Sequence, residues 1–402
     1  MKKVLIGFVV RLLNIFVPVR KKHWVFGADV GRMYREGSKY LLEYMLMNHQ
    51  DYQCTFITRN RDVVRELKEK GIPVAYNYSI KGIYAIVIAD CVFTTQVLGD
   101  IYYAYKKKER TFFYLVHGQP FKVAKKMLPD TYRLKLINLS NGNNSCLNLQ
   151  ILKLKDILFK FFVVGYEMKD VAFVSATSSF TAMFQRKEFE TSVKILGMPR
   201  NDALFDTKRM ETENWNYSYS DKFVITYMPT HRMYGRGELS QTPFLHREDV
   251  QQWMRDNNVI LLVKQHPNMM RKMTSVEETD VIKNISKSGF DPQVVIYHSN
   301  LLITDYSSVW IDYLLMRRPL IFYFYDNFEE EDAGCYYDLR VEFPHNYCES
   351  EEELFSMIKQ AYLNGESLIP SESKVEKYHK YVDGNSCKRY FEEIAKMKYG
   401  EE

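Results

Sequence analysis

Short apolar runs alternate with longer amphipathic segments along almost the whole chain. The runs that predict buried strands are residues 23–27, 54–58, 74–76, 91–95, 112–116, 171–175, 194–196, 223–228, 260–264, 294–297, 301–303 and 320–322. Segments with helical spacing lie between or after them, at 41–47, 63–70, 83–89, 351–363 and 378–398. Strands that alternate with helices are typical of parallel sheets with crossover helices, so we predict an α/β protein.

The length of the chain and one polar segment indicate two domains. The chain has 402 residues, which exceeds a typical single domain. A polar segment, Thr207 to Asp221, separates the first series of strands from the second. We therefore predict an N-terminal domain at 1–206 on the acceptor and membrane side, a donor-binding domain at 207–370, and a C-terminal helix at 371–402 that packs back on the first domain.

Composition narrows the class of protein. Apolar residues make up 46% and charged residues 26%, as in globular proteins. The net charge of +5 is mild, so it gives no argument for nucleic acid, but it suits a surface that meets anionic lipid or phosphate. The six cysteines show no CxxC spacing, which argues against a zinc site or a disulfide framework and favours a reducing cytosol.

Two basic and apolar segments raise the question of a membrane. Residues 2–22 are apolar with lysine or arginine at both ends, but they are too short and too interrupted for a secure transmembrane helix. They predict either an interfacial anchor or a first helix packed on the core. Residues 122–160 are basic and apolar by turns, which fits a membrane surface or an ordinary surface helix.

The stretch 301–322 gives the sharpest local signal for chemistry. Its order of apolar run, polar loop, amphipathic run and second apolar run predicts strand, loop, helix and strand. Ser307 and Ser308 would cap the helix, whose free N–H groups suit a phosphate. Asp312, one turn further, would reach a ribose hydroxyl. An isolated Ser-Ser pair, however, more often only caps a helix.

Other polar residues follow predicted strands in the same way. His117 comes directly after the strand 112–116, where α/β folds place their chemistry, and its imidazole would act as a base near neutral pH. Gly118 would permit an unusual turn there. Taken alone, this histidine is better explained as a structural residue of the turn. In the second half, strand ends place further polar residues on one rim: Arg232, Lys264, His266, Tyr325 and Asp326.

An ordered set of motifs gives the family. The motifs are His117-Gly118-x-Pro120-x-Lys122, Gly197-x-Pro199-Arg200-Asn201-Asp202, Pro229-Thr230-x-Arg232, His266-Pro267, Thr304-Asp305-Tyr306-Ser307-Ser308, Arg318-Pro319-x-Ile321-Phe322-Tyr323 and Asp383-Gly384. From about residue 110 to the C-terminus the chain resembles the CDP-glycerol glycerophosphotransferase family of teichoic-acid and capsule synthesis; residues 1–100 fit only loosely. Without a long segment before its first strand, it resembles the shorter, primase-like members.

The resemblance implies a fold, a reaction and a set of site residues. The fold is GT-B-like, with two Rossmann-type parallel-sheet domains facing each other across a cleft. The reaction moves glycerol phosphate from CDP-glycerol to a hydroxyl of a lipid-linked acceptor, with release of CMP and without cofactor or metal. The implied residues are His117 and His266 as catalytic, and Ser307 and Ser308 for donor phosphates. To these we add, as predictions, Arg232 and Lys264 for donor phosphates, Asp305 and Asp312 for the donor ribose or nucleotide, and Gly118, Lys122, Arg200, Asn201 and Asp202 on the acceptor side.

The same resemblance implies the location and leaves alternatives open. It predicts a peripheral enzyme on the cytoplasmic face of the cell membrane, with a teichoic-acid-type or capsule acceptor and no nucleic acid as partner. Gln119 and His231 depart from the family's usual threonine and aromatic residue, so the acceptor and the polyol stay open. CDP-ribitol or a nucleotide sugar is an alternative donor, and a membrane-bound module without catalysis is a further alternative.

Overall fold

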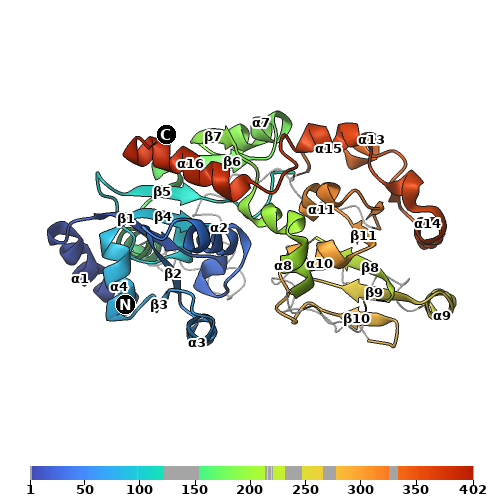
Figure 1. Ribbon diagram of the computed structural model, residues 1–402, viewed down its shortest axis with the longest axis horizontal. Helices are drawn as coiled ribbons and strands as arrows, with labels where there is room; N and C mark the ends of the chain where they lie inside the picture. Colours follow the sequence, from blue (N-terminus) through green and yellow to red (C-terminus); the bar gives the residue numbers. More distant parts are fainter. Residues whose placement is uncertain are drawn as a thin grey trace.

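Two parallel sheets organise the molecule. The computed structural model describes residues 2–96, 98–121, 154–212, 215, 219, 221–230, 247–265, 278–325 and 334–401. One sheet has the strand order β3-β2-β1-β4-β5-β6-β7 and the other β10-β9-β8-β11-β12-β13, and the recorded strand pairs in both are parallel. Figure 1 shows each sheet in its own lobe. The prediction of an α/β fold is confirmed.

The first lobe is formed by the elements from α1 to β7. Its elements are α1 (Lys2–Phe16), β1 (Arg20–Phe26), α2 (Glu36–Asn48), β2 (Gln53–Thr58), α3 (Arg61–Glu69), β3 (Val74–Tyr76), α4 (Ile80–Ile88), β4 (Ala89–Thr94), β5 (Thr111–Tyr114), the helical turn η3 (Lys160–Val164), β6 (Val171–Ala176), α7 (Ser179–Glu188) and β7 (Ser192–Ile195). The central order 3-2-1-4-5 is that of a Rossmann fold, in which ligands bind at the carboxyl ends of the strands.

The second lobe repeats this plan and ends in helices. Its elements are β8 (Phe223–Met228), α9 (Glu248–Asp256), β9 (Val259–Val263), β10 (Ile282–Asn284), α10 (Pro292–His298), β11 (Leu301–Thr304), α11 (Val309–Tyr313), β12 (Leu320–Tyr323), α13 (Leu339–Glu342), β13 (Tyr347–Cys348) and α14 (Glu351–Asn364). The remaining elements are η5 (Pro199–Phe205) and α8 (Thr207–Thr212) before this lobe, and α15 (Glu372–Tyr378) and α16 (Ser386–Tyr399) after it.

One predicted strand is wrong. Residues 294–297 lie inside the helix α10. The helix starts because the Asp291 side chain accepts a hydrogen bond from the Gln293 N–H (3.4 Å) and Pro292 occupies the first helical position. A short buried run of β-branched residues fits a strand and a buried helix equally well, so the Asp-Pro signal should have decided between them.

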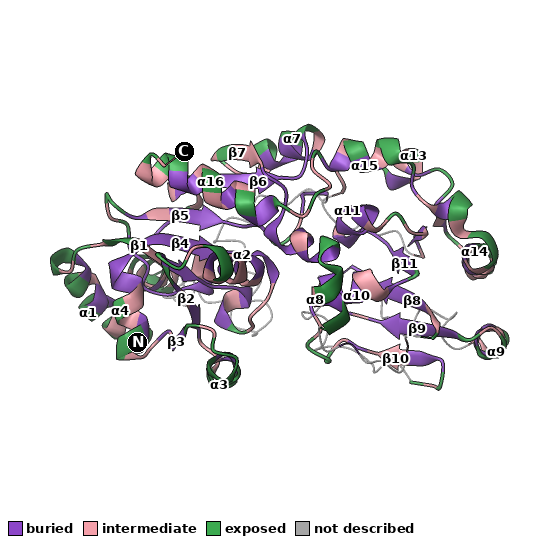
Figure 2. Cartoon of the chain, viewed as in Figure 1, coloured by how far each residue is buried: buried purple, intermediate pink, exposed green. Residues whose placement is uncertain are grey.

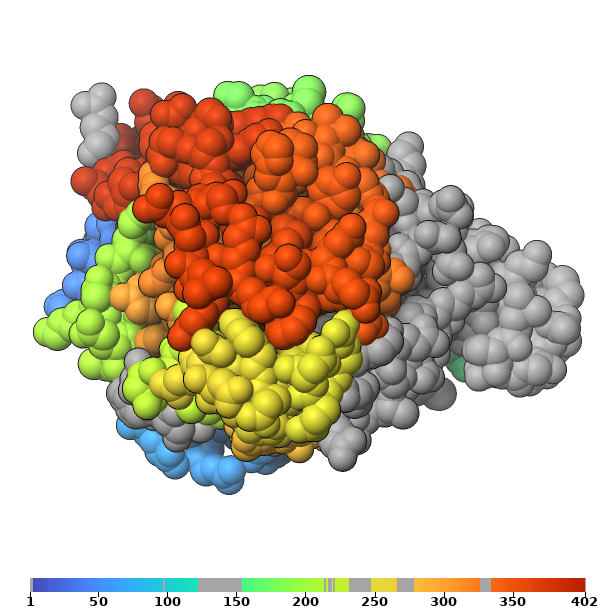
Figure 3. Space-filling model, turned by 90° about the vertical axis from the view of Figure 1, so that its right-hand side faces the viewer, coloured from blue at the N-terminus to red at the C-terminus, as the bar shows by residue number. Residues whose placement is uncertain are grey.

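Aromatic side chains fill much of the core. Phe26, Phe93 and Phe113 lie on the adjacent strands β1, β4 and β5. The ring centroids of Phe26 and Phe93 are 4.5 Å apart, and those of Phe93 and Phe113 are 5.0 Å apart. In the second lobe, Trp253 of α9 contacts Phe355 of α14, and these helices lie next to each other on the end of the lobe (Figure 3). Figure 2 shows that buried residues concentrate in the sheets and exposed ones on the outer helices. Both sheets are thus covered by helices, as parallel sheets require.

The C-terminal helix α16 returns to the first lobe, where Figure 1 shows it in red. The Asp202 carboxylate accepts hydrogen bonds from the first two N–H groups of α16, at 2.8 Å and 2.7 Å, and so caps the helix. At the other end, the Tyr399 hydroxyl donates to Asp90 (2.5 Å) and accepts from the Trp24 indole (3.1 Å). The first lobe is therefore closed by the last helix of the chain, while the predicted boundaries at 206 and 370 stay predictions.

The helix α1 is packed on one side and apolar on the other. Val10 is buried, and the Tyr105 hydroxyl donates to the Gly7 carbonyl at 2.8 Å. The opposite side leaves large apolar side chains exposed: Leu5, Phe8, Val9, Leu12, Leu13, Ile15 and Phe16. Within the described ranges, no helix has both the length and the apolar content needed to cross a bilayer.

Candidate functional site

The loop after β5 leaves the first lobe and reaches the second. It begins with a strained residue, since Val116 has a φ of 37°, a left-handed conformation that a β-branched side chain rarely adopts. We expected Gly118 to supply the unusual turn, and this is wrong, because Gly118 has no positive φ. The strain at Val116 turns the chain so that His117, which is exposed, stands beyond the end of the sheet.

Gly118 is needed for a close approach between the lobes. A Cβ atom at this position would lie 2.6 Å from the Oγ of Ser308, the residue before α11. Because Gly118 has no Cβ, its main chain can lie this near to the Ser308 hydroxyl without displacing it. His117, predicted as the base, is thus the neighbour of a residue that lies against Ser308, which was predicted on the donor side.

The end of the same loop is anchored in the second lobe. Phe121 is buried, and its ring centroid lies 5.9 Å from that of Trp310 in α11 and 5.2 Å from that of Tyr337. The Tyr336 N–H donates to the Phe121 carbonyl at 2.9 Å. Residues 117–121, called the bridging loop below, therefore connect β5 of one lobe to α11 of the other.

A buried group of polar side chains lies behind the bridging loop. Asp312 accepts hydrogen bonds at one carboxylate oxygen from Arg200 (2.5 Å) and Gln293 (3.3 Å), and at the other from Asn201 (2.9 Å). The second terminal nitrogen of Arg200 donates to the His117 carbonyl. Each of these four side chains belongs to a residue no more than 7% exposed. We call Arg200, Asn201, Gln293 and Asp312 the lobe-bridging network.

The second-lobe residues predicted for the donor lie at strand ends. Lys264 follows β9, and Asp305, Ser307 and Ser308 follow β11. Lys264 donates to the Phe290 carbonyl (3.0 Å), and desolvation lowers its pKa to about 8, so most of it is protonated at neutral pH. Asp305 is buried and accepts from the Thr230 N–H at 2.7 Å. The expected cap is wrong for Ser308, whose side chain makes no capping hydrogen bond.

Several predicted residues fall elsewhere. Lys122, Arg232, His266 and Asp326 lie outside the described residues, so their places stay predictions. Asp202 is described, and both of its oxygens serve the start of α16. Burial raises the pKa of Asp202, although these hydrogen bonds oppose the shift.

Two residues near the site were not predicted. Besides desolvation, the positive charge of Arg35 lowers the pKa of Lys264, so these two cations of opposite lobes interact electrostatically. Glu36 is buried, and burial raises the pKa of its carboxyl group. Both lie at the start of α2, which follows β1, and α2 packs against η5. The position after a parallel strand was the signal that could have indicated both residues.

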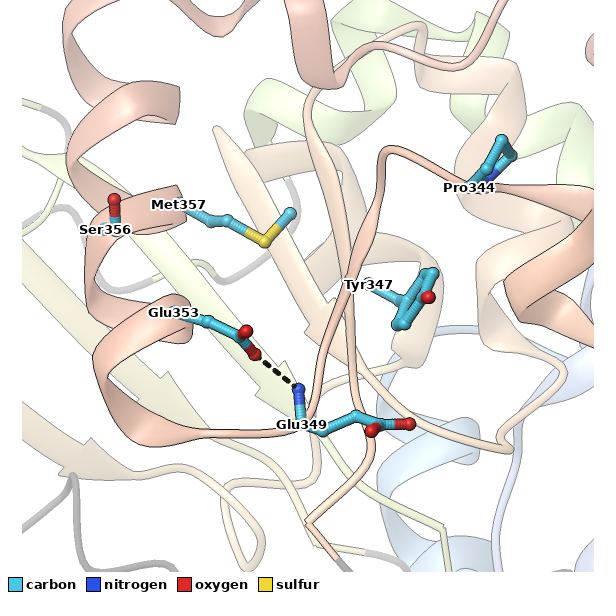
Figure 4. Close-up of a pocket in the computed structure, with 6 residues that line it drawn as sticks. All are labelled: Pro344, Tyr347, Glu349, Glu353, Ser356 and Met357. Atoms are coloured by element: carbon cyan, nitrogen blue, oxygen red, sulfur yellow. Dashed lines mark hydrogen bonds between the residues drawn. The ribbon is translucent and has the colours of Figure 1, made fainter.

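A surface pocket of about 430 Å³ lies apart from the bridging loop, between β13 and α14. Figure 4 shows its lining residues: Pro344, Tyr347, Glu349, Glu353, Ser356 and Met357. The Glu353 carboxylate accepts from the Glu349 N–H at 3.1 Å and caps α14. Two carboxylates in this lining disfavour a phosphate ligand, so the pocket does not suit a nucleotide donor.

The Gly118→Ala substitution tests the close approach. The added methyl group has to displace the Ser308 hydroxyl, so we expect kcat/KM for transfer to fall about 10- to 100-fold with little change in thermal unfolding. In a Ser308→Gly background the same substitution should have little further effect, because the clash is gone. Equal losses in both backgrounds would show that Ser308 is not the atom displaced.

Comparison with known proteins adds the family. Residues 9–396 match the family described as CDP-Glycerol:Poly(glycerophosphate) glycerophosphotransferase. The chain is 28% identical over 390 residues to the teichoic acid glycerol-phosphate transferase of Staphylococcus aureus, covering 92% of each chain. It is 25% identical over 354 residues to the teichoic acid poly(glycerol phosphate) polymerase of Bacillus subtilis, covering 86% of this chain and 44% of that polymerase. The chain thus spans nearly all of the first relative and under half of the second.

A solved structure of a variant of the wall teichoic acid polymerase TagF has the same fold. The superposition covers 99% of this chain and 94% of that chain, with a TM-score of 0.74 and 18% identity. A likeness at this identity concerns the fold, and it confirms the prediction of a GT-B-like arrangement of two parallel-sheet lobes.

Proposed function

Because the chain belongs to the CDP-glycerol:poly(glycerophosphate) glycerophosphotransferase family, we propose that it transfers glycerol phosphate from CDP-glycerol to a hydroxyl of a lipid-linked acceptor, with release of CMP. One observation carries the proposal at the level of the site: the bridging loop holds Gly118 against Ser308, which joins the base candidate to the donor side. TagF, whose fold this chain shares, has been soaked with CDPG in a solved structure.

The proposed reaction is an in-line displacement at phosphorus. The acceptor oxygen forms a bond to the phosphorus that carries glycerol, and the bond from that phosphorus to the oxygen of CMP breaks. His117 accepts the proton of the acceptor hydroxyl, and the negative charge that develops on the CMP phosphate is offset by Lys264 and the hydroxyls of Ser307 and Ser308. Arg232 and His266 have the same donor-side role by resemblance.

A donor panel tests the proposed function. We would incubate the purified chain and a membrane extract with CDP-glycerol, CDP-ribitol or a nucleotide sugar, and measure CMP or nucleoside diphosphate together with the mass of the lipid product. The expected result is rapid CMP release from CDP-glycerol and a lipid heavier by glycerol phosphate. Preference for CDP-ribitol would identify CDP-ribitol as the donor. We include it because a ribitol-phosphate polymerase of Staphylococcus aureus is 28% identical to this chain over 209 residues, which is 50% of this chain. Turnover of no donor would leave a binding module.

We assign the membrane contact to one face of the first lobe. The helix α1 packs along η3 and leaves its apolar side exposed, and the neighbouring helical residues Leu154, Ile157 and Phe161 are also exposed. Arg11 joins the two segments by donating to the Phe161 carbonyl at 3.0 Å. Exposed apolar side chains with basic residues beside them suit an anionic lipid surface. The proposed location is therefore peripheral, on the cytoplasmic face of the membrane.

A further inference from the structure

The carboxylate of Asp312 has no open side toward a ligand. The residue is 2% exposed, and its two oxygens accept the three side-chain hydrogen bonds of the lobe-bridging network. A ribose hydroxyl would have to replace one of these partners. Replacing a charge-assisted hydrogen bond of 2.5 Å with a neutral one is unfavourable in a buried site. The geometry therefore argues against the ribose role that the position of Asp312 in the predicted helix suggested.

Arg200 links Asp312 to the main chain of His117. One terminal nitrogen of its guanidinium binds Asp312 and the other binds the His117 carbonyl. A planar guanidinium fixes the direction of both contacts, because its N–H groups diverge in a rigid fork. A shift of Asp312 would therefore move the carbonyl group of the residue that carries the imidazole.

The helix α11 holds the bridging loop by three attachments. Ser308, at its start, touches Gly118; Trp310 packs on Phe121; and Asp312 holds the His117 carbonyl through Arg200. All three α11-side residues lie within five consecutive positions of the chain. The same short helix thus sets the donor-side serine and the main chain of the base candidate.

We propose that Arg200 and Asp312 are positioning residues for glycerol phosphate transfer, which hold His117 at a fixed place relative to Ser308. The inference rests on the proposed function, because glycerol phosphate transfer is the reaction that these two residues would serve. Two members of the network belong to η5, which precedes the second lobe, and the other two belong to α10 and α11 of that lobe, so the network also ties these segments together at the site.

Kinetics of Asp312→Asn test the proposal. We expect kcat to fall about 10- to 100-fold, as for a displaced catalytic group, while KM for CDP-glycerol changes little. The donor made with 2′-deoxyribose separates positioning from ribose binding: the ratio of kcat/KM for the ribose and deoxyribose donors should be the same in the variant and in the native protein. A raised KM with unchanged kcat, or a lost preference for ribose, would overturn the proposal and make Asp312 a donor ligand.

A second variant guards against a folding defect. Arg200→Gln/Asp312→Asn removes both charges, so no buried charge is left without its partner. We expect it to fold and still to show the reduced kcat, because the His117 carbonyl has lost the guanidinium. Asp90→Asn is the matched control, since Asp90 is an equally buried carboxylate at the far end of β4, bonded to Tyr399. Native kcat in the folded double variant would overturn the proposal.

Hydrogen exchange gives a readout that needs no turnover. The amides of residues 115–121 should exchange faster in the double variant than in the native protein or in Asp90→Asn, because the bridging loop has lost one attachment. Unchanged exchange would overturn the inference even if CDP-glycerol is the donor. Absence of turnover by the native protein, together with faster exchange in the variant, would overturn the proposed function and leave the positional link in place.

Discussion

His117→Ala is expected to lower kcat for glycerol phosphate transfer by about 10²- to 10⁴-fold, the contribution of a general base. KM for CDP-glycerol should change little, because the imidazole acts on the acceptor hydroxyl. The side chain is exposed and the main-chain contact to Arg200 survives the substitution, so the fold should be unaffected. Initial rates at saturating donor, with thermal unfolding of the same sample, measure both effects.

The matched control for this experiment is His345→Ala. His345 is also exposed but belongs to the second lobe between α13 and β13, away from the bridging loop. It should keep native kcat. Near-normal turnover of CDP-glycerol by His117→Ala would exclude His117 as the base and return it to the structural role that a lone histidine after a strand ordinarily has.

Charging the exposed side of α1 is expected to abolish binding to anionic vesicles. In Leu12→Glu/Phe16→Glu, two residues that are 45% and 80% exposed in the structure lose the transfer of their exposed apolar surface into lipid, worth about 1–2 kcal/mol each. Repulsion by anionic headgroups adds about 1 kcal/mol per charge near the surface. The partition coefficient, measured by co-sedimentation with phosphatidylglycerol vesicles, should therefore fall by at least about 10²-fold.

Turnover of a water-soluble acceptor analogue should be unchanged in this double variant, because the residues are exposed and distant from the bridging loop. The matched control is Leu363→Glu, at the end of α14 in the second lobe, since this leucine is 80% exposed, as Phe16 is. It should bind vesicles like the native chain. If the α1 variant still binds as tightly, the membrane contact lies on another surface, and α1 is only a helix that packs on the first lobe through Gly7 and Val10.

The apolar pattern predicted the sheets because a parallel strand buried on both faces is a continuous apolar run. The carboxyl-end rule then predicted Lys264 and Ser308 on one rim of the second half, and the resemblance added His117 from the first half across a cleft. The misplaced strand at 294–297 shows the limit of the pattern, since burial alone made a short helix look like a strand.

The lobe-bridging network could not be predicted from the sequence. Arg200 and Asp312 are 112 residues apart, and nothing local indicates that the carboxylate faces the guanidinium. Arg200 was identified by its motif and Asp312 by its place one turn into a predicted helix, and both were given ligand-binding roles. Gln119, which departs from the family pattern, likewise faces the interior: it is buried, and its amide donates to the Ser175 carbonyl at 3.4 Å. Contacts between residues far apart in the chain depend on the tertiary structure, which a single sequence considered alone does not give.

The return of α16 to the first lobe has a consequence for synthesis on the ribosome. Trp24 and Asp90 are translated early, yet their partner Tyr399 emerges only after the entire second lobe. Co-translational folding therefore cannot finish lobe by lobe from the N-terminus, as it does in many multidomain proteins. The nascent first lobe must therefore wait for α16, and its completion follows the synthesis of the second lobe.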